Sequence, residues 1–223
     1  MIQVFLLPIN PIYTQQDEPL KAYLPSNRVD NLERYAFSSD KKNCLFNYLL
    51  LEYCIHITFN IDIKTLEFGY GDNHKPILLS HPNIHFNTSH TKGFICCVLS
   101  DTPCGIDTEN SKRHLPNILN AVFSSSEKTQ LNNFISDDVR YSEIFYTMWT
   151  LKEAYTKMLG TGLTTNFKEV NTLDNHFIKN ALTIKENNFI ISIYSSEIGG
   201  IEDSNNIIHL LSEDVIYNFY KIN

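Results

Sequence analysis

The sequence predicts an α+β fold, because long helical stretches are mixed with short runs that resemble β-hairpins. Strands and helices do not alternate regularly along the chain, so a doubly wound parallel sheet is not expected. The chain has 223 residues and a hydrophobic share of 43%, which is enough for one large domain or two small ones with a substantial core.

Short β-rich runs bounded by turn-forming residues are the expected strands. In the first half they lie at 1–7, 83–86, 93–99 and 106–109. Toward the C-terminus they lie at 177–184, 188–194 and 207–211. Pro8 and Pro11 end the first strand, and residues 87–92 are the expected connection of a hairpin.

Two long helices are expected, with a shorter one between them. The first begins at the N-cap Asp40 and is apolar on nearly all sides to about residue 57, so it should be buried. Ser124 and Glu127 match a capping box that opens the short helix. The last helix is expected over 140–159, where glycines end it.

The composition excludes several classes of protein. Lys and Arg number 18 and Asp and Glu 25, a net charge of −7, so a general nucleic-acid-binding protein, which would be basic, is not expected. No apolar run is long enough to span a bilayer, and the N-terminal segment lacks the basic start of a signal peptide. Five cysteines without a CxxC pair are typical of a reduced chain, so we expect a cytoplasmic protein without a membrane partner.

Familiar nucleotide and hydrolase motifs are missing from the sequence. It has no GxxxxGK[ST] run, no GxGxxG run that opens a helix and no GxSxG elbow. Histidines close together in sequence leave a zinc site as a candidate, although their spacing matches no compact ligand pair. They are His74, His81, His85 and His90.

A pair of acidic residues marks the first candidate site. Asp107 and Glu109 are two positions apart on an expected strand, so both carboxylates should point to the same face. Paired carboxylate oxygens suit a hard cation such as Mg²⁺. The alternative is a solvated strand face that carries alternating acids.

A second candidate lies on the last expected helix. Glu153 and Lys157 are four residues apart and therefore share one face of that helix. They are placed to supply a third metal carboxylate and a phosphate contact. The alternative is an ordinary surface ion pair.

Cationic and hydroxyl side chains near expected turns form the third candidate. Lys75 lies in the run NHKP, and Ser89 and His90 end the run FNTSH. Such side chains, together with backbone N–H groups, hold anions such as phosphate. The alternative is a polar hairpin connection.

Taken in order, these motifs resemble the 4′-phosphopantetheinyl transferases of the large type that activates surfactin synthetase. The runs that carry the resemblance are HKP at 74–76, FNTSH at 86–90, GIDTE at 105–109, FSSSE at 123–127 and WTLKEAYTKMLGTGL at 149–163. Within these motifs His74 stands where the family has glycine. The resemblance extends over roughly residues 28–163.

The resemblance implies a fold of two similar α+β halves in a pseudo-twofold arrangement. Each half would be a small antiparallel sheet packed on a long helix, with the active site at their interface. The N-terminal half, 1–102, would hold the nucleotide of coenzyme A. The C-terminal half, 103–223, would carry the metal carboxylates and dock the carrier protein. A chain of this length resembles the monomeric type.

The family's reaction moves the 4′-phosphopantetheine arm of coenzyme A onto a serine of an apo acyl or peptidyl carrier protein and releases adenosine 3′,5′-bisphosphate. By resemblance, Mg²⁺ or Mn²⁺ would be held by Asp107, Glu109 and Glu153. The implied catalytic residues are Glu153, as the base for the carrier serine, Asp107 and His90. The implied coenzyme A contacts are Arg28, Lys75, Ser89, His90 and Lys157. Fatty-acid, polyketide and nonribosomal peptide synthesis all use this reaction.

Near the 3′-phosphate the sequence departs from the family. Arg28 stands at one basic position, but Asn31 replaces a second basic residue and Cys44 replaces a small hydroxyl residue. Lys41 and Lys42 are candidates to compensate for Asn31. The alternative function is a catalytically inactive regulatory protein that binds coenzyme A, but binding alone would not require three metal carboxylates.

Docking of an acidic carrier protein raises a question of charge. Long-range attraction to a chain of net charge −7 would be poor, so a local apolar patch with a few cations is expected to carry the docking. Phe123 and the region 115–134 are the candidates, with a place in the core as the alternative.

Overall fold

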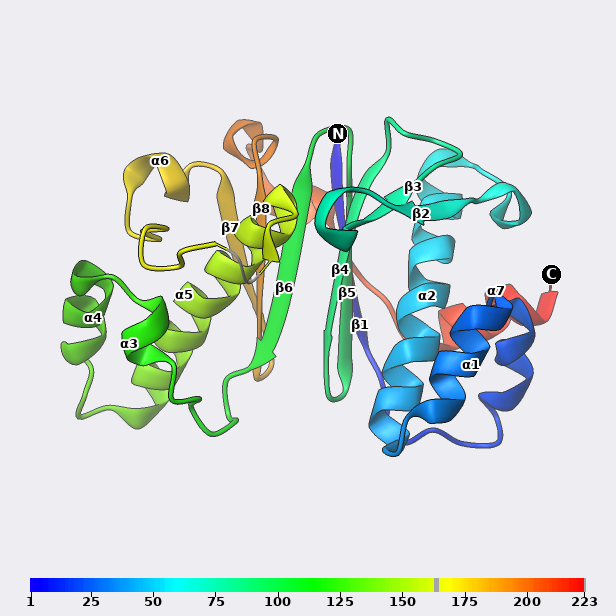
Figure 1. Cartoon of the computed structure of the whole chain (residues 1–223), viewed down its shortest axis with the longest axis horizontal. Coiled ribbons are helices and arrows are strands. Elements are labelled where there is room, and N and C mark those ends of the chain that lie inside the picture. The colour runs from blue at the N-terminus through cyan, green and yellow to red at the C-terminus, as the bar shows by residue number, and fades with distance from the viewer. Residues whose placement is uncertain (163–164, 223) are drawn as a thin grey trace.

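The computed structural model describes residues 1–162 and 165–222. Four layers lie side by side: a helix, a four-stranded sheet, a three-stranded sheet and a second helix (Figure 1). The two sheets face one another through an apolar cluster built from alternate residues of their strands, such as Val4, Cys96, Ile106 and Ile191. Each helix covers the outer face of one sheet.

The N-terminal half consists of one strand, one long helix and a hairpin. These elements are β1 (Ile2–Pro8), α2 (Ser38–Phe59), β4 (His85–Thr91) and β5 (Phe94–Ser100). The strand order is β4-β5-β1-β9, so the second strand of the hairpin lies in the middle. Odd-numbered residues of β1 and β5 pack on α2, and even-numbered residues face the other sheet.

The C-terminal half repeats this arrangement. It consists of β6 (Cys104–Asn110), α5 (Asp138–Leu159), β7 (Ala181–Glu186) and β8 (Phe189–Ser195), with strand order β6-β8-β7. Both long helices have 22 residues, and both end at a residue in the left-handed conformation, Asn60 or Gly160. The expected α+β fold of two similar halves is therefore confirmed, since β1, α2, β4 and β5 correspond to β6, α5, β7 and β8.

Shorter elements connect and cover these halves. The remaining helices and strands are α1 (Ser26–Arg34), β2 (Phe68–Tyr70), β3 (Pro76–Leu78), α3 (Leu119–Val122), α4 (Ser125–Asn132), α6 (Asn175–Ile178), β9 (Ile208–Leu210) and α7 (Glu213–Ile222). Among the residues that the structure describes, no helix combines the length and apolarity needed to cross a membrane.

The end of the chain returns to the N-terminal half. β9 pairs in parallel with β1, with Leu210 opposite Leu6, and α7 packs against α2. Figure 1 shows α7 beside α1 and α2, far from α5. The expected division assigns 103–223 to the C-terminal half, whereas the structure places residues 208–222 on the N-terminal half.

Several expected element boundaries are wrong for local reasons. The N-cap of α2 is Phe37, so Asp40 lies in the first turn of that helix. Residues 87–91 belong to β4, because Gly93, with φ of 86°, allows a turn tight enough to extend both strands. The run 177–184 begins in α6 and becomes strand only at Ala181. The capping box of Ser124 and Glu127 is confirmed.

A close approach between β6 and α5 fixes the geometry of the C-terminal half. A Cβ atom at Gly105 would lie 2.0 Å from the carbonyl oxygen of Ala154 and 2.6 Å from the backbone nitrogen of Met158. Both contacts are to helix backbone, which cannot move aside as a flexible side chain would. The glycine of the GIDTE motif is therefore a packing requirement.

Replacing Gly105 with alanine should lower the free energy of unfolding by about 3 kcal/mol, because overpacking forces strand and helix apart. Urea denaturation measures this change. Gly200→Ala is the control: nothing lies within 4 Å of a Cβ atom there, and little effect is expected. Equal stability of Gly105→Ala and the wild type would contradict the argument.

A buried carboxyl group lies between α2 and α7. Glu52 is 6% exposed, and the phenol of Tyr220 lies 3.0 Å from its Oε2 and 3.1 Å from the carbonyl oxygen of Leu49. The phenol has one hydrogen, which it can donate either to Oε2 of Glu52 or to the carbonyl oxygen of Leu49. Burial raises the pKa of Glu52 to about 7, from 4.5.

Stability should therefore fall between pH 4.5 and pH 7. In that range the unfolded chain releases a proton that the folded chain retains, so rising pH favours unfolding by up to about 3 kcal/mol. Glu52→Gln should be more stable than the wild type at pH 8 and equally stable at pH 4, as measured by urea denaturation at both pH values. The same difference at both pH values would contradict the raised pKa.

Candidate active site

The candidate site lies where β4, β6 and α5 meet, at the junction of the two halves (Figure 1). β6 pairs with β8 along one edge, and within the described residues no strand pairs with its other edge. The backbone N–H of Ile106 donates to Oδ1 of Asn87 over 3.1 Å. The backbone oxygen of Ile106 accepts from Nζ of Lys157 over 3.2 Å. Side chains from β4 and α5 thus satisfy this edge at Ile106.

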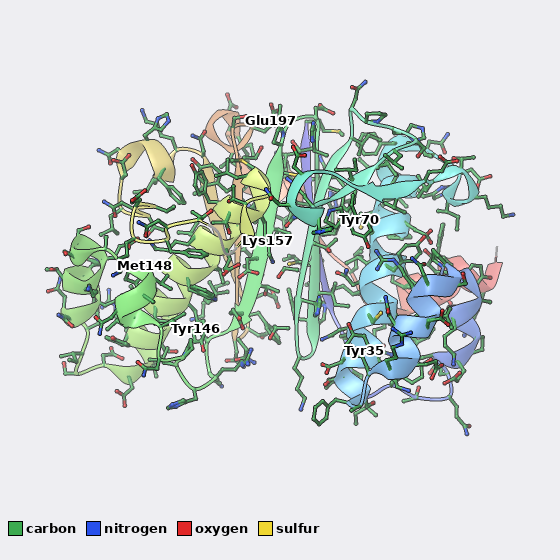
Figure 2. All side chains as sticks on the ribbon, in the orientation of Figure 1. Tyr35, Tyr70, Tyr146, Met148, Lys157 and Glu197 are labelled. Atoms are coloured by element: carbon green, nitrogen blue, oxygen red, sulfur yellow. The ribbon has the colours of Figure 1, made fainter. Side chains whose placement is uncertain are left out.

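Lys157, Ser89 and Asp107 form a closed triangle of hydrogen bonds. Nζ of Lys157 lies 2.7 Å from Oδ1 of Asp107 and 2.9 Å from Oγ of Ser89. The Ser89 hydroxyl donates to the same Asp107 oxygen over 2.8 Å. Figure 2 shows Lys157 at the junction of the two halves. Three predicted site residues from three elements are thus brought together.

Two further carboxyl groups lie near Asp107. Burial and the negative charge of Asp107 raise the pKa of Glu109, whose Oε2 accepts from Arg113 over 3.1 Å. Burial raises the pKa of Glu153 to about 7, and the charges of Asp107 and Glu109 raise it further than Lys157 lowers it. Repulsion among these acidic groups therefore adds to the effect of burial.

These oxygens have the chemistry that Mg²⁺ prefers, but they are not gathered as a ligand set. Within residues 1–162 and 165–222, no group of three or more His, Cys, Asp and Glu side chains is placed to hold a metal ion. Oδ1 of Asp107 already accepts hydrogen bonds from Lys157 and Ser89. A cation at Asp107 would therefore have to compete with the Lys157 ammonium group.

A cavity of about 420 Å³ in the N-terminal half contains Arg28. The guanidinium carbon of Arg28 lies 4.7 Å from the centre of the Tyr48 ring, and its charge also acts on the thiol of Cys44. Tyr48, Asn47 and Thr88 line this cavity, and sequence reasoning missed them. Tyr48 lies one helical turn after Cys44, but an aromatic residue on so apolar a helix is indistinguishable from core.

Lys75 and His90, which were expected to contact phosphate, have other surroundings in the structure. Nζ of Lys75 donates to the backbone oxygen of Met158 over 2.6 Å, so Lys75 caps the C-terminus of α5. Burial lowers the pKa of Lys75. Desolvation and the nearby Lys157 ammonium lower the pKa of His90, although Asp40 and Asp107 oppose this. A phosphate would have to supply the charge that favours protonated His90.

The two lysines expected to compensate for Asn31 are engaged elsewhere. Lys42 is 2% exposed and pairs with Asp17 over 2.6 Å and Glu213 over 2.8 Å. Nζ of Lys41 lies 3.4 Å from Glu33. The expected compensation by Lys42 is therefore wrong, because Asp17 and Glu213 already neutralise its charge in the interior.

Two residues of the recognised motifs form a buried ion pair. Lys152 and Glu127 are both fully buried, and Nζ lies 2.9 Å from Oε2. Lys152 also donates to the backbone oxygens of Phe167, over 2.8 Å, and Val170. The pair thus joins α4, α5 and the segment after α5. Phe123 is fully buried too, so the expected docking role of Phe123 is wrong and its place in the core is confirmed.

Comparison with known proteins agrees with this arrangement. Residues 11–102 match the family model of the N-terminal part of 4′-phosphopantetheinyl transferases, and residues 103–208 match the model of the 4′-phosphopantetheinyl transferase superfamily. The chain belongs to the 4′-phosphopantetheinyl transferase superfamily. Its enzyme class is therefore 4′-phosphopantetheinyl transferase. Leu163, the last residue of the longest motif, lies outside the described residues.

Curated relatives of this transferase come from bacteria and yeast. The 4′-phosphopantetheinyl transferase psf-1 of Bacillus pumilus is 27% identical over 166 residues, 73% of this chain and 70% of the relative. The transferase Sfp of Bacillus subtilis is 26% identical over 153 residues, which are 69% and 67% of the two chains. An L-aminoadipate-semialdehyde dehydrogenase-phosphopantetheinyl transferase of Candida glabrata is 28% identical over 140 residues, or 59% and 53%.

Replacing Lys152 with methionine should lower the free energy of unfolding by about 3–5 kcal/mol, because Glu127 would remain buried without its partner. The double variant Lys152→Met/Glu127→Gln should recover part of this loss. Urea denaturation measures both, with the half-buried Lys128→Met as the control. A double variant no more stable than the single one would contradict the pairing.

Proposed function

We propose that this transferase moves the 4′-phosphopantetheine arm of coenzyme A onto a serine of an apo acyl or peptidyl carrier protein and releases adenosine 3′,5′-bisphosphate. The observation that carries the proposal is the triangle of Lys157, Ser89 and Asp107 beside Glu153. The Lys157 ammonium group and the half-buried carboxyl group of Glu153 lie together where the two halves meet. Phosphoryl transfer depends on positioning of this kind and on stabilisation of charge.

The binding steps are assigned to cationic side chains. Lys157 and His90 would hold the diphosphate of coenzyme A, and Arg28 would hold the 3′-phosphate in the cavity behind Tyr48. The N-terminal half would thus carry the nucleotide, and the C-terminal half the acidic groups. Asp107, Glu109 and Glu153 would hold Mg²⁺ or Mn²⁺, which neutralises negative charge on the diphosphate when bound.

Glu153 is the proposed general base. Its pKa of about 7 lies near neutral pH, where about half of the groups are ionised and can accept a proton. Glu153 takes the proton of the carrier serine as the serine oxygen attacks the phosphorus on the pantetheine side. The bond from that phosphorus to the bridging oxygen breaks, and adenosine 3′,5′-bisphosphate leaves.

We propose a monomer that acts in the cytoplasm.

The intact mass of an apo carrier protein tests this function. Incubation with the enzyme, coenzyme A and Mg²⁺ should add about 340 Da, the mass of the arm transferred as a phosphoryl group, and EDTA should suppress the gain. Glu153→Gln should lower kcat by about 100-fold or more, as expected for loss of a general base. Glu143→Gln is the matched control, because Glu143 also lies on α5 but pairs with Lys185, away from the site.

Each outcome separates the candidate functions. No gain on several carrier types, with coenzyme A still bound, would favour the inactive regulatory protein. A Glu153→Gln variant that turns over at the wild-type rate would remove Glu153 from the mechanism.

A further inference from the structure

A cavity of about 450 Å³ lies in the N-terminal half, on elements that take no part in the candidate active site. Its walls come from the segment before α1, from α2 and the connection after it, and from α7, which lies far from α5 (Figure 1). The lining residues include Tyr23, Glu52, His56, Asp62, Lys64 and Phe219. A cavity of this size is large enough for a small organic molecule.

Glu52 brings a buried carboxyl group to this cavity. The residue is 6% exposed, and its hydrogen-bond partners are the phenols of Tyr48 and Tyr220. The positive charge that acts on it is that of Arg28, whose guanidinium carbon lies 4.7 Å from the centre of the Tyr48 ring. Among the residues that the structure describes, none forms an ion pair with Glu52. A cation in the cavity would therefore offset the cost of ionising this buried group.

His56 adds a hydrogen-bond acceptor one helical turn after Glu52. Its Nδ1 lies 2.8 Å from the backbone oxygen of Ile61. Because a carbonyl oxygen can only accept, Nδ1 carries the hydrogen, and Nε2 of the neutral ring is an acceptor. Glu52 and His56 are four residues apart, so they share one face of α2, and both line the cavity.

Aromatic rings form part of the cavity wall. Tyr23 and Phe219 both line it, and the ring of Phe219 lies 5.1 Å from that of His56. Aromatic faces attract ammonium and guanidinium groups, and they also pack against the apolar stem of such a group.

The charges of the lining favour a cation over an anion. Asp62 and Lys64 are exposed and of opposite sign, so their charges balance. With His56 neutral, the charge of ionised Glu52 is then the net charge of the lining.

We propose that this cavity binds a ligand that carries an ammonium or guanidinium group on a short apolar stem. The cation pairs with Glu52, and the stem lies against Tyr23 and Phe219. Two sources have this chemistry: a free amine or guanidine compound, and a lysine or arginine side chain of a protein partner. The inference goes beyond the proposed function and does not depend on it.

Titration of the protein with n-butylguanidinium, followed by nuclear magnetic resonance of its backbone amides, tests the site. Saturable shifts are expected for amides around Glu52 on α2 and Phe219 on α7. The neutral compound n-butylurea, which has nearly the same shape, should bind about tenfold more weakly because it cannot make a charge-assisted hydrogen bond. Equal affinities, or shifts confined to other elements, would overturn the proposal.

The variant Glu52→Gln removes the charge and keeps the shape of the side chain. At pH 8 it should bind n-butylguanidinium about tenfold more weakly than the wild type, as expected for loss of a charged partner, and n-butylurea equally well. Glu202→Gln is the matched control, because Glu202 is exposed and its loss changes the net charge equally. Equal affinity of the two variants would contradict the role of Glu52. If Glu52→Gln does not fold, the comparison of the two compounds on the wild type still decides.

The affinity should also depend on pH. The pKa of Glu52 is about 7, so the group is mostly protonated at pH 6 and must release a proton before it pairs with a cation. Affinity of the wild type for n-butylguanidinium should therefore rise about tenfold from pH 6 to pH 8, and that of Glu52→Gln should not. The same rise in Glu52→Gln would assign the effect to His56 and overturn the pairing with Glu52.

A blocked peptide with one arginine between glycines separates the two sources of the cation. Tighter binding of n-butylguanidinium would support a small molecule as the ligand, and tighter binding of the peptide would support a protein partner. Binding of neither at millimolar concentration would overturn the proposal. None of these measurements involves transfer to a carrier protein, so this inference and the proposed function fail independently.

Discussion

Polar contacts at the free edge of β6 join the two halves of this transferase, in addition to the apolar cluster between the sheets. An unpaired strand edge inside a protein leaves backbone donors and acceptors that must find partners. At Ile106 the partners are the Asn87 amide on β4 and the Lys157 ammonium on α5. The residues that satisfy this edge therefore carry the next residue, Asp107, to Ser89 and Lys157, and the candidate site forms where the edge is closed.

The close approach of β6 and α5 fixes the relative positions of the strand and the helix that carry the site residues. Gly105 lets the strand backbone contact the helix backbone near Ala154 and Met158, so Asp107 and Lys157 start from fixed positions. The buried pair of Lys152 and Glu127 holds the opposite side of α5 against α4. Two charged residues of the motifs thus stabilise the helix that carries Glu153 and Lys157.

The sequence predicted which side chains lie close together better than it predicted how they are held. The resemblance of the motifs placed Asp107, Ser89 and Lys157 in one site, and hydrogen bonds join the three side chains in the structure. The tight turn at Gly93 was missed, so Ser89 was expected in a connection and instead lies on β4. The cap that Lys75 provides for α5 depends on a contact over 83 positions, which no local pattern reports. The return of β9 and α7 to the N-terminal half is hidden for the same reason.

The repeat of strand, helix and hairpin leaves one difference between the halves, at the edges of β1 and β6. β1 and β6 occupy equivalent places, each at the side of a three-stranded unit away from the first hairpin strand. β9 pairs with the outer edge of β1, whereas within the described residues no strand pairs with that edge of β6. The edge of β1 is therefore paired with the backbone of β9, and the edge of β6 is bonded at Ile106 by polar side chains from β4 and α5. β9 stabilises the fold at the edge of β1. Within the described residues no strand takes the corresponding place beside β6, and the candidate site lies at that edge.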